Sequence, residues 1–207
     1  MTYICGVKTT PDDIFNFSDR SPDPVSGSLL IAKPPMDDLF FRRSVVLMVE
    51  HDKATGSMGV VLNFPTDNML DAVLPEMTGA DRIPLYLGGP VGLNALFFVH
   101  TLPPDIVPDS IAFGDGLYFG GDFDALTDYI NHGGVTDGTV RFLVGYSGWA
   151  KGQLGEELDQ GAWAVLDAMP TTPLLTEARD AMWRKAVAHL GDRYRLWGNW
   201  PEEVYLN

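Results

Sequence analysis

The chain is built from short apolar runs that end at glycine or proline. Gly27–Ala32 is followed by Pro34, and Ser44–Glu50 is a β-branched run. The first run predicts a strand followed by a break, and the second is continuously apolar, as is typical of a strand that is buried on both faces. The turn residues in His51–Gly56 predict a hairpin that joins the second run to another apolar strand, Val60–Asn63. The first part of the chain therefore predicts strands connected by tight turns.

The same reasoning extends along the chain. Further strands are predicted at Leu85–Leu87, Ala95–His100, Ile111–Phe113, Leu117–Phe119, Thr139–Tyr146 and Trp163–Leu166. Start and stop signals predict helices at Asn68–Leu74, at Phe123–His132 behind the N-cap Asp122, near Gln153, and at Thr172–Leu190. Apolar residues at helical spacing in the last helix predict one core-facing stripe, formed by Leu175, Ala178, Met182, Ala186 and Leu190.

Strands joined by hairpins, with only three or four helices, do not form a regular βαβ alternation. The fold class is therefore α+β. We expect a single domain over residues 27–207, because no repeat or linker divides this region. Residues 1–26 are polar and turn-rich, which predicts a partly mobile N-terminal arm. Its apolar residues Ile14, Phe15 and Phe17 could dock on the domain.

The amino-acid composition further restricts the kind of protein that this chain can be. The chain has 207 residues, of which 45% are hydrophobic, so it can bury a core without metal or disulfide support. Its one cysteine, Cys5, cannot form an internal disulfide, which favours a reducing compartment. No apolar run approaches the length of a membrane span, and no signal peptide is visible. We expect a cytoplasmic protein that does not enter a membrane.

The formal net charge is −14, and its distribution excludes a function class. Between Ala54 and Val140 there are eleven acidic residues and one basic residue, Arg82. Such a surface repels a phosphate backbone, so the sequence does not favour direct nucleic-acid binding. The basic stretch 179–195 could form a local patch. Its cations could equally pair with neighbouring acids, namely Asp180, Asp192 and Glu202.

Local enzyme and cofactor motifs are incomplete. Gly145–Trp149 resembles a nucleophile elbow, but Trp149 stands where that motif needs glycine. Gly114-Asp115-Gly116 begins like a dinucleotide fingerprint and then lacks its third glycine. The four histidines are isolated and Cys5 has no cysteine neighbour, so we expect no metal site. No cofactor is predicted either.

Several segments together are similar to one protein family. The chain resembles the YqgE/AlgH family of bacterial proteins from about Gly27 to its C-terminus. The resemblance rests on Gly27–Ala32, Phe41–His51, Gly56–Pro65, Leu87–Val91, Gly145–Trp149 and Gly152–Leu154. It implies a mixed, largely antiparallel branched sheet that forms a barrel-like core with helices packed on it. Members have no established biochemical activity and are often labelled transcriptional regulators, a label at odds with the acidity of this chain.

Two positions depart from the family pattern. The family usually has glutamate directly after Gly-Gln-Leu, where this chain has Gly155, although Glu156 and Glu157 could replace it. It also commonly has a basic residue between the asparagine and proline that end the second strand of the hairpin, where this chain has Phe64. A role for that carboxylate, or for that cation on an anionic ligand, is therefore in question here.

Glycine, polar and aromatic residues at predicted strand ends form the candidate site. Each has a structural alternative: Arg43 could hold an anion or pair with Asp37, Asp38 or Glu50, and His51 could act as a base or fix its loop. The glycine turn could bind an anion, the aromatics could line a pocket or pack in the core, and Gln153 could start a helix. The candidates are Arg43, Ser44, His51, Asn63, Gly88, Gly89, Pro90, Tyr146, Ser147, Gly148, Trp149 and Gln153.

These residues favour a non-catalytic protein that binds a partner protein or small ligand where the segments converge in one groove. A second hypothesis is a hydrolase that uses Ser44 or Ser147 with His51, which requires a serine hydroxyl within hydrogen-bond reach of the imidazole. A third hypothesis, direct or indirect transcriptional regulation, follows only from the family label.

Overall fold

The computed structural model describes residues 21–34, 36 and 38–200. Most of the predicted N-terminal arm, including Ile14, Phe15 and Phe17, lies outside the described residues, as does Cys5. Ser21, at the start of the described part, donates a hydrogen bond from its Oγ to the carbonyl of Trp163 at 3.2 Å.

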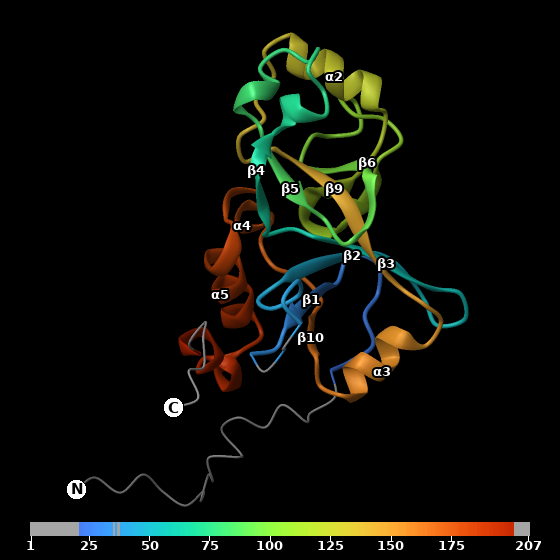
Figure 1. Ribbon diagram of the computed structural model, residues 1–207, viewed down its shortest axis with the longest axis vertical. Helices are drawn as coiled ribbons and strands as arrows, with labels where there is room; N and C mark the ends of the chain where they lie inside the picture. The colour runs from blue at the N-terminus through green and yellow to red at the C-terminus, as the bar shows by residue number, and fades with distance from the viewer. Residues whose placement is uncertain (1–20, 35, 37, 201–207) are drawn as a thin grey trace, which may run out of the picture.

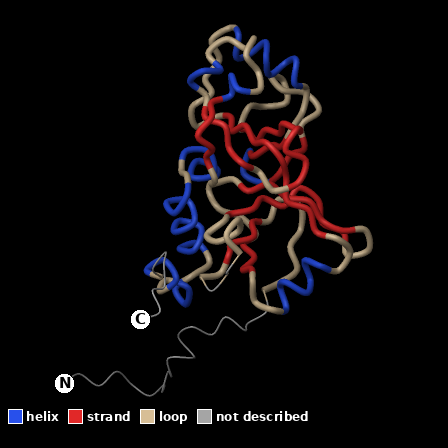
Figure 2. Tube along the Cα trace, viewed as in Figure 1, coloured by secondary structure: helices blue, strands red, loops and turns tan. Residues whose placement is uncertain are grey.

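A ten-stranded mixed sheet organises the molecule. Its strands lie between helices in Figure 2, and its main path runs in the order β10-β1-β2-β3-β9-β6-β8-β7, with β4 and β5 as a branch. The strands are β1 (Leu29–Ala32), β2 (Val45–Asp52), β3 (Gly56–Val61), β4 (Pro65–Met69), β5 (Pro84–Leu87), β6 (Val91–His100), β7 (Ile111–Phe113), β8 (Leu117–Phe119), β9 (Val140–Trp149) and β10 (Trp163–Leu166).

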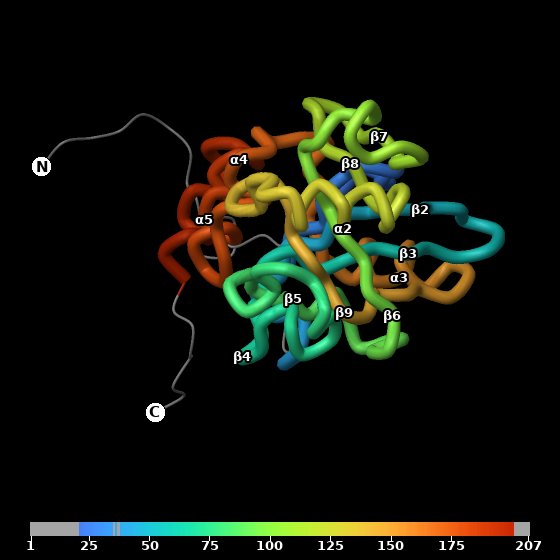
Figure 3. Tube along the Cα trace, turned by 90° about the horizontal axis from the view of Figure 1, so that it is seen from above, coloured from blue at the N-terminus to red at the C-terminus, as the bar shows by residue number. Residues whose placement is uncertain are grey.

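Four α-helices lie in the described part of the chain, and α2 is capped at Asp122 as predicted: the Asp122 carboxylate accepts a hydrogen bond from the Ala125 amide. The helices are α2 (Phe123–Asn131), α3 (Gln153–Asp159), α4 (Thr171–Thr176) and α5 (Arg179–His189). Short 3₁₀ turns are η1 (Leu70–Ala72), η2 (Ala80–Arg82), η3 (Gly114–Gly116), η4 (Asp192–Tyr194) and η5 (Trp197–Asn199). In Figures 1 and 3, α4 and α5 lie together on one side, opposite the outer end of the β2–β3 hairpin.

The strand β1 and residues Val45–Val49 of β2 are buried on both faces, which confirms the interpretation of the continuous apolar run Ser44–Glu50. Leu29 and Leu47 pack in the core beneath α4 and α5, where they meet Met182 and Trp183. The alternate residues, among them Leu30 and Val46, pack in a second core with α3. A third core, at the α2 end, is built on β6 and β9.

The strand β9 is the branch point of the sheet. Along one edge it pairs antiparallel with β3 near its C-terminal end and parallel with β5 near its middle, while β6 pairs along its other edge. The path ends at β10 and β7, each of which pairs with a single strand among the described residues. The sheet is therefore open, and the prediction of a barrel-like core is wrong. The helix α5 covers the apolar face that the opposite wall of a barrel would have covered.

The predicted helix Thr172–Leu190 is interrupted, and α4 and α5 replace it. Glu177 and Ala178 are extended, and Arg179 has a positive φ of 45°. The Arg179 amide donates to the carbonyl of Asn63 at 2.6 Å. A buried arginine, Arg141, donates to carbonyls at the end of α4. Partners from the sheet thus satisfy backbone groups that a continuous helix would have paired within itself.

Candidate functional site

A groove of about 600 Å³ lies where the segment before β2, the start of β4 and the start of α5 meet. We call it the arginine groove, defined by Phe40, Arg42, Arg43, Phe64, Arg179 and Asp180. Its volume lies within the range of about 300–1,000 Å³ that is common for ligand sites. The groove therefore has the size of a small-molecule or peptide-end site.

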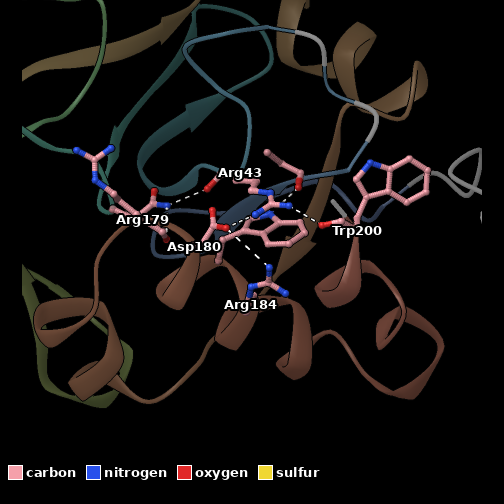
Figure 4. Close-up of polar contacts among 8 residues, drawn as sticks. Arg43, Arg179, Asp180, Arg184 and Trp200 are labelled. Carbon is pink, nitrogen blue, oxygen red and sulfur yellow. Dashed lines mark hydrogen bonds and ion pairs between the residues drawn. The ribbon is translucent and has the colours of Figure 1, made fainter. Parts of the chain in front are cut away.

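Arg43 forms one wall of the groove, but internal contacts already occupy its side chain. Its guanidinium forms an ion pair with Asp180, donates to the carbonyl of Trp200 at 2.5 Å, and lies 5.1 Å from the ring centre of Trp183 (Figure 4). Arg184 also reaches the same Asp180 carboxylate, at 3.8 Å. Arg43 thus ties the segment before β2 to α5 and η5, and its acidic partner is Asp180 rather than a predicted residue.

Arg179 differs from Arg43. Its side chain is exposed and has no hydrogen-bond or ion-pair partner among the described residues. In Figure 4 its guanidinium points away from the pair formed by Arg43 and Asp180. Its backbone, in contrast, is held on both sides of the residue by Asn63. A fixed backbone therefore presents an uncompensated cation at the groove.

Asn63 forms hydrogen bonds with the backbones of both Arg43 and Arg179. Its side chain is fully buried, and its Oδ1 accepts a hydrogen bond from the Val45 amide at 2.9 Å. Its Nδ2 donates to the carbonyls of Arg43, at 2.8 Å, and Arg179, at 3.0 Å. Because both ends of the amide are bonded to backbone, Asn63 positions the groove and is not itself available to a ligand.

Gly88 and Gly89 lie where β3 and β5 separate along one edge of β9, a place that we call the glycine fork. The Gly88 carbonyl accepts from the Val61 amide and its own amide donates to the Val144 carbonyl, both at 2.8 Å. A Cβ on Gly89 would lie 1.9 Å from the carbonyl carbon of Tyr146, and one on Gly88 would lie 2.3 Å from a backbone oxygen. Close backbone packing thus accounts for both glycines, and the Gly88 amide is not directed to an anion. Pro90 follows as an exposed turn residue before β6.

The serines proposed as nucleophiles lie away from the proposed base. Ser44 is fully buried, and its Oγ has no hydrogen-bond partner among the described residues. Ser147 is also buried and donates from Oγ to the Gly88 carbonyl at 3.3 Å. The Nδ1 atom of His51 instead contacts the Oγ of Ser57, its cross-strand partner, at 2.8 Å. Neither Ser44 nor Ser147 forms the serine–histidine contact that the hydrolase hypothesis requires.

The predicted aromatic residues separate into two places. Tyr146 packs edge-on against Phe97 at 6.0 Å, beside the exposed Gly148. Trp149 lies on the opposite face of the sheet in the α3 core, 6.2 Å from Trp163. Core packing thus accounts for both aromatics in the structure, and neither lines the arginine groove.

One carboxylate organises the tryptophan cluster. The Oε2 atom of Glu157, on α3, accepts hydrogen bonds from the indole nitrogens of Trp149, at 2.8 Å, and Trp163, at 2.7 Å. Gln153 accepts from the Ala150 amide and donates to the other oxygen of Glu157, each at 3.0 Å. Glu157 therefore holds α3 to the sheet through the two indoles.

Two buried basic residues that had no predicted role also prove to be structural. The guanidinium of Arg141 donates to the carbonyls of Leu62, Leu175 and Glu177 and lies 4.0 Å from the ring centre of Tyr86. Burial lowers the pKa of Arg141 to about 10, because the cation is removed from water. Its place in the otherwise apolar run Thr139–Tyr146 is a sequence signal that could have identified it.

His100 is the second. It is fully buried, and its Nε2 lies 3.0 Å from the Gly120 carbonyl and 3.1 Å from the Oγ of Ser110. A carbonyl only accepts, so this nitrogen carries the proton in the neutral ring. Burial lowers the pKa of His100 from its ordinary value of 6.5, although backbone hydrogen bonds act in the other direction. The residue therefore favours its neutral form in the folded protein.

Of the predicted site residues, Arg43 lines the arginine groove directly and Asn63 supports it. The remaining predicted residues do not line the groove. They lie behind the groove, in the glycine fork, in the β2–β3 hairpin that contains His51, or in the two aromatic clusters. The sequence did not single out Phe40 or Arg179 as site residues, and it gave Phe64 only as a departure from a family pattern. Arg179 carried no usable signal, because its position looked like an ordinary place within a helix.

No group of three or more histidine, cysteine, aspartate or glutamate side chains is arranged to hold a metal ion in residues 21–34, 36 and 38–200. Within the same part of the chain, no helix is long and apolar enough to cross a membrane.

The fold and the groove define an α+β protein whose open, branched sheet holds a polar and aromatic groove against a helix start. The chain belongs to the AlgH-like family, whose model matches residues 29–195. The resemblance seen in the sequence is thereby confirmed.

Individual relatives agree with this assignment. A UPF0301 protein of Parabacteroides distasonis is 44% identical over 195 residues, covering 94% of this chain and 98% of the relative. One of Bacteroides fragilis is 38% identical and covers 94% of this chain and 97% of its own. The solution structure of the AlgH protein from Pseudomonas aeruginosa has a TM-score of 0.66 at 31% identity, covering 84% of this chain and 93% of that one. The crystal structure of the Corynebacterium diphtheriae protein DIP2367 has a TM-score of 0.71 at 25% identity, with 92% and 99% covered.

Proposed function

We propose that this chain is a non-catalytic binding protein that takes a partner protein or a small ligand in the arginine groove. The observation that carries the proposal is the exposed side chain of Arg179, which has no hydrogen-bond or ion-pair partner among the described residues and lines the same groove of ligand size as Phe40 and Phe64. Arginine and aromatic side chains together are the residues most enriched at binding hot spots. A single cysteine favours the cytoplasm as the site of this activity.

The groove chemistry favours binding over catalysis. Among the described residues that line it, none is histidine, serine or cysteine. Its one hydroxyl, that of Thr66, donates to the Leu85 carbonyl at 2.9 Å and so is part of the backbone framework. An activated nucleophile needs an adjacent base, and none lines this groove. We therefore propose no reaction for it.

Direct nucleic-acid binding is not part of the proposal. Within the basic stretch 179–195, Arg184 lies 3.8 Å from the Asp180 carboxylate, and Lys185 forms an ion pair with Glu177. These contacts support internal pairing of the stretch. The net charge of −14 opposes approach to a phosphate backbone.

Site-specific crosslinking in cells tests the proposal. A photoreactive amino acid replaces Leu39, a groove residue that is 84% exposed, or Leu93, which is 59% exposed on β6 and does not line the groove. We expect light-dependent adducts at Leu39 and not at Leu93, with the intact mass separating protein from small-molecule adducts. Equal adduct yields at the two positions, or none at Leu39, would refute a binding function for the groove.

A further inference from the structure

The backbone of the arginine groove is held in an unfavourable conformation. Four non-glycine residues of the described chain have a positive φ, and two of them, Arg43 at 57° and Arg179 at 45°, line this groove. The other two are aspartates, a residue type that tolerates this region better than arginine does. Strained backbone persists where the surrounding structure enforces it, and such strain gathers at ligand sites.

Asn63 enforces this conformation. Its Nδ2 bonds the carbonyl of each strained arginine, while its own carbonyl accepts from the Arg179 amide. The fold thus fixes where both arginine side chains leave the main chain. The Arg43 side chain is used within the protein, where it contacts Asp180 and the carbonyl of Trp200. No comparable contact exists for Arg179 among the described residues, so its guanidinium is available to a ligand.

The charged residues that line the groove determine how many negative charges a ligand can carry there. Three arginines and two aspartates line it: Arg42, Arg43, Arg179, Asp67 and Asp180. Arg43 and Asp180 are already paired with each other, and Arg42 takes part in another interaction, so the charge offered to a ligand is that of Arg179. Arg179 balances one negative charge on the ligand. Asp67, which also lines the groove, disfavours a second.

An apolar surface forms another part of the groove, which Thr66 and Asn68 also line. Phe40 and Phe64 meet edge to face with their ring centres 5.8 Å apart, and the exposed Leu39 continues this surface. Aromatic and aliphatic walls bind the carbon body of a ligand, while a planar guanidinium binds a carboxylate through two parallel hydrogen bonds. A ligand that fits both parts has one carboxylate on an apolar body.

We propose that the arginine groove binds such a carboxylate, with Arg179 holding its two oxygens and the apolar body lying on Phe40 and Phe64. This inference rests on the proposed function and names its ligand class. A small aryl or aliphatic acid and the C-terminal carboxylate of a peptide share this chemistry, and both are of a size for about 600 Å³.

Calorimetric titration of the full chain tests the ligand class. The probes are phenylacetate, phenylacetamide, inorganic phosphate, and N-acetyl-alanyl-phenylalanine with a free or an amidated C-terminus. We expect at least one free acid to bind, its amide to bind about tenfold or more weakly, and phosphate to bind more weakly than the acid, since a lost ionic hydrogen bond is worth roughly a factor of ten. The stronger of the two acids identifies the source of the carboxylate.

Variants assign the contact to Arg179. Arg179→Asn removes the cation at a residue type that accepts a positive φ, so it should fold, and it should weaken acid binding by about tenfold or more. Arg179→Lys keeps the charge without the planar fork and should give an intermediate loss. Lys151→Asn, which removes an exposed cation outside the groove, is the control and should leave binding unchanged.

Three results would overturn the inference: equal binding of acid and amide, phosphate binding tighter than the acids, or an Arg179→Asn protein that binds the acid like the wild type. If none of the acids binds while crosslinking at Leu39 persists, the ligand class is wrong and the binding function stands. Loss of the Leu39 adducts removes the binding function itself.

Discussion

Replacing Asn63 by alanine tests the framework on which the groove depends. The substitution removes one acceptor and two donor interactions, those with the Val45 amide and the carbonyls of Arg43 and Arg179. Leaving a buried polar group without a partner costs about 1–3 kcal/mol. The Arg179 carbonyl is only partly buried and counts toward the low end. We therefore expect Asn63→Ala to lower the free energy of unfolding by about 3–5 kcal/mol.

Urea denaturation monitored by tryptophan fluorescence measures this change. With an m-value of about 2 kcal/mol/M, the unfolding midpoint should fall by roughly 2 M. Asn68→Ala is the matched control, because Asn68 is an exposed asparagine on the same groove and its hydrogen bonds with Thr66 run through its backbone. The control should change stability by less than about 0.5 kcal/mol. A loss below about 1 kcal/mol for Asn63→Ala would show that the three bonds do not hold the two arginines in place.

Three further predictions concern stability. Because folding lowers the pKa of His100, the unfolded chain binds the proton more readily, and the free energy of unfolding should decrease as pH falls below 6.5. His100→Gln should make the free energy of unfolding depend less on pH, as measured by urea titrations from pH 7 to pH 5. Gly89→Ala should unfold or severely destabilise the protein, because the new Cβ would collide with the Tyr146 backbone. Gly155→Ala, in contrast, meets open space within α3 and should raise the free energy of unfolding by about 0.5–1 kcal/mol. Thermal melting measures both changes. Ser44→Ala removes a buried hydroxyl without a partner and should leave the urea midpoint unchanged or higher; a clear loss would reveal a hidden bond.

The sequence predicted elements well where local pattern and tertiary packing agree. The runs that became β1 and β2 are apolar at every position facing the two cores, so their strand assignment required no knowledge of the partner strands. The helix α3, predicted from start signals near Gln153, begins at that residue. Local pattern therefore sufficed for these elements.

Prediction failed where distant backbone competed with local preference. Asn68–Leu74 was predicted as a helix, but Pro65–Met69 pairs as β4 with β5 and only the turn η1 follows. The break before α5 depends on Asn63, between β3 and β4, and on Arg141 in β9, so no window around Arg179 contains its cause. The barrel prediction failed for a similar reason: the branched sheet was expected, but closure depends on pairing between distant strands, and the end strands β10 and β7 each pair with a single strand among the described residues.

The candidate site shows the same division. Arg43 and Asn63 stood out as polar residues at strand ends, and the structure brings them together. The glycines at the fork also stood out, but for close packing of strands rather than for a ligand. Arg179 and Phe40 reach the groove through tertiary contacts that their neighbours in sequence do not announce.

The pairing of β1 with β10 has a consequence for how the protein is made. Leu29 lies opposite Leu166, so β1, the first strand of the described residues, waits for more than 130 further residues to be made before its second neighbour exists. The β2–β3 hairpin similarly waits for β9. A nascent chain would display these apolar strands with unpaired edges throughout most of translation, which makes it a natural client for chaperones and leaves truncated products prone to aggregate.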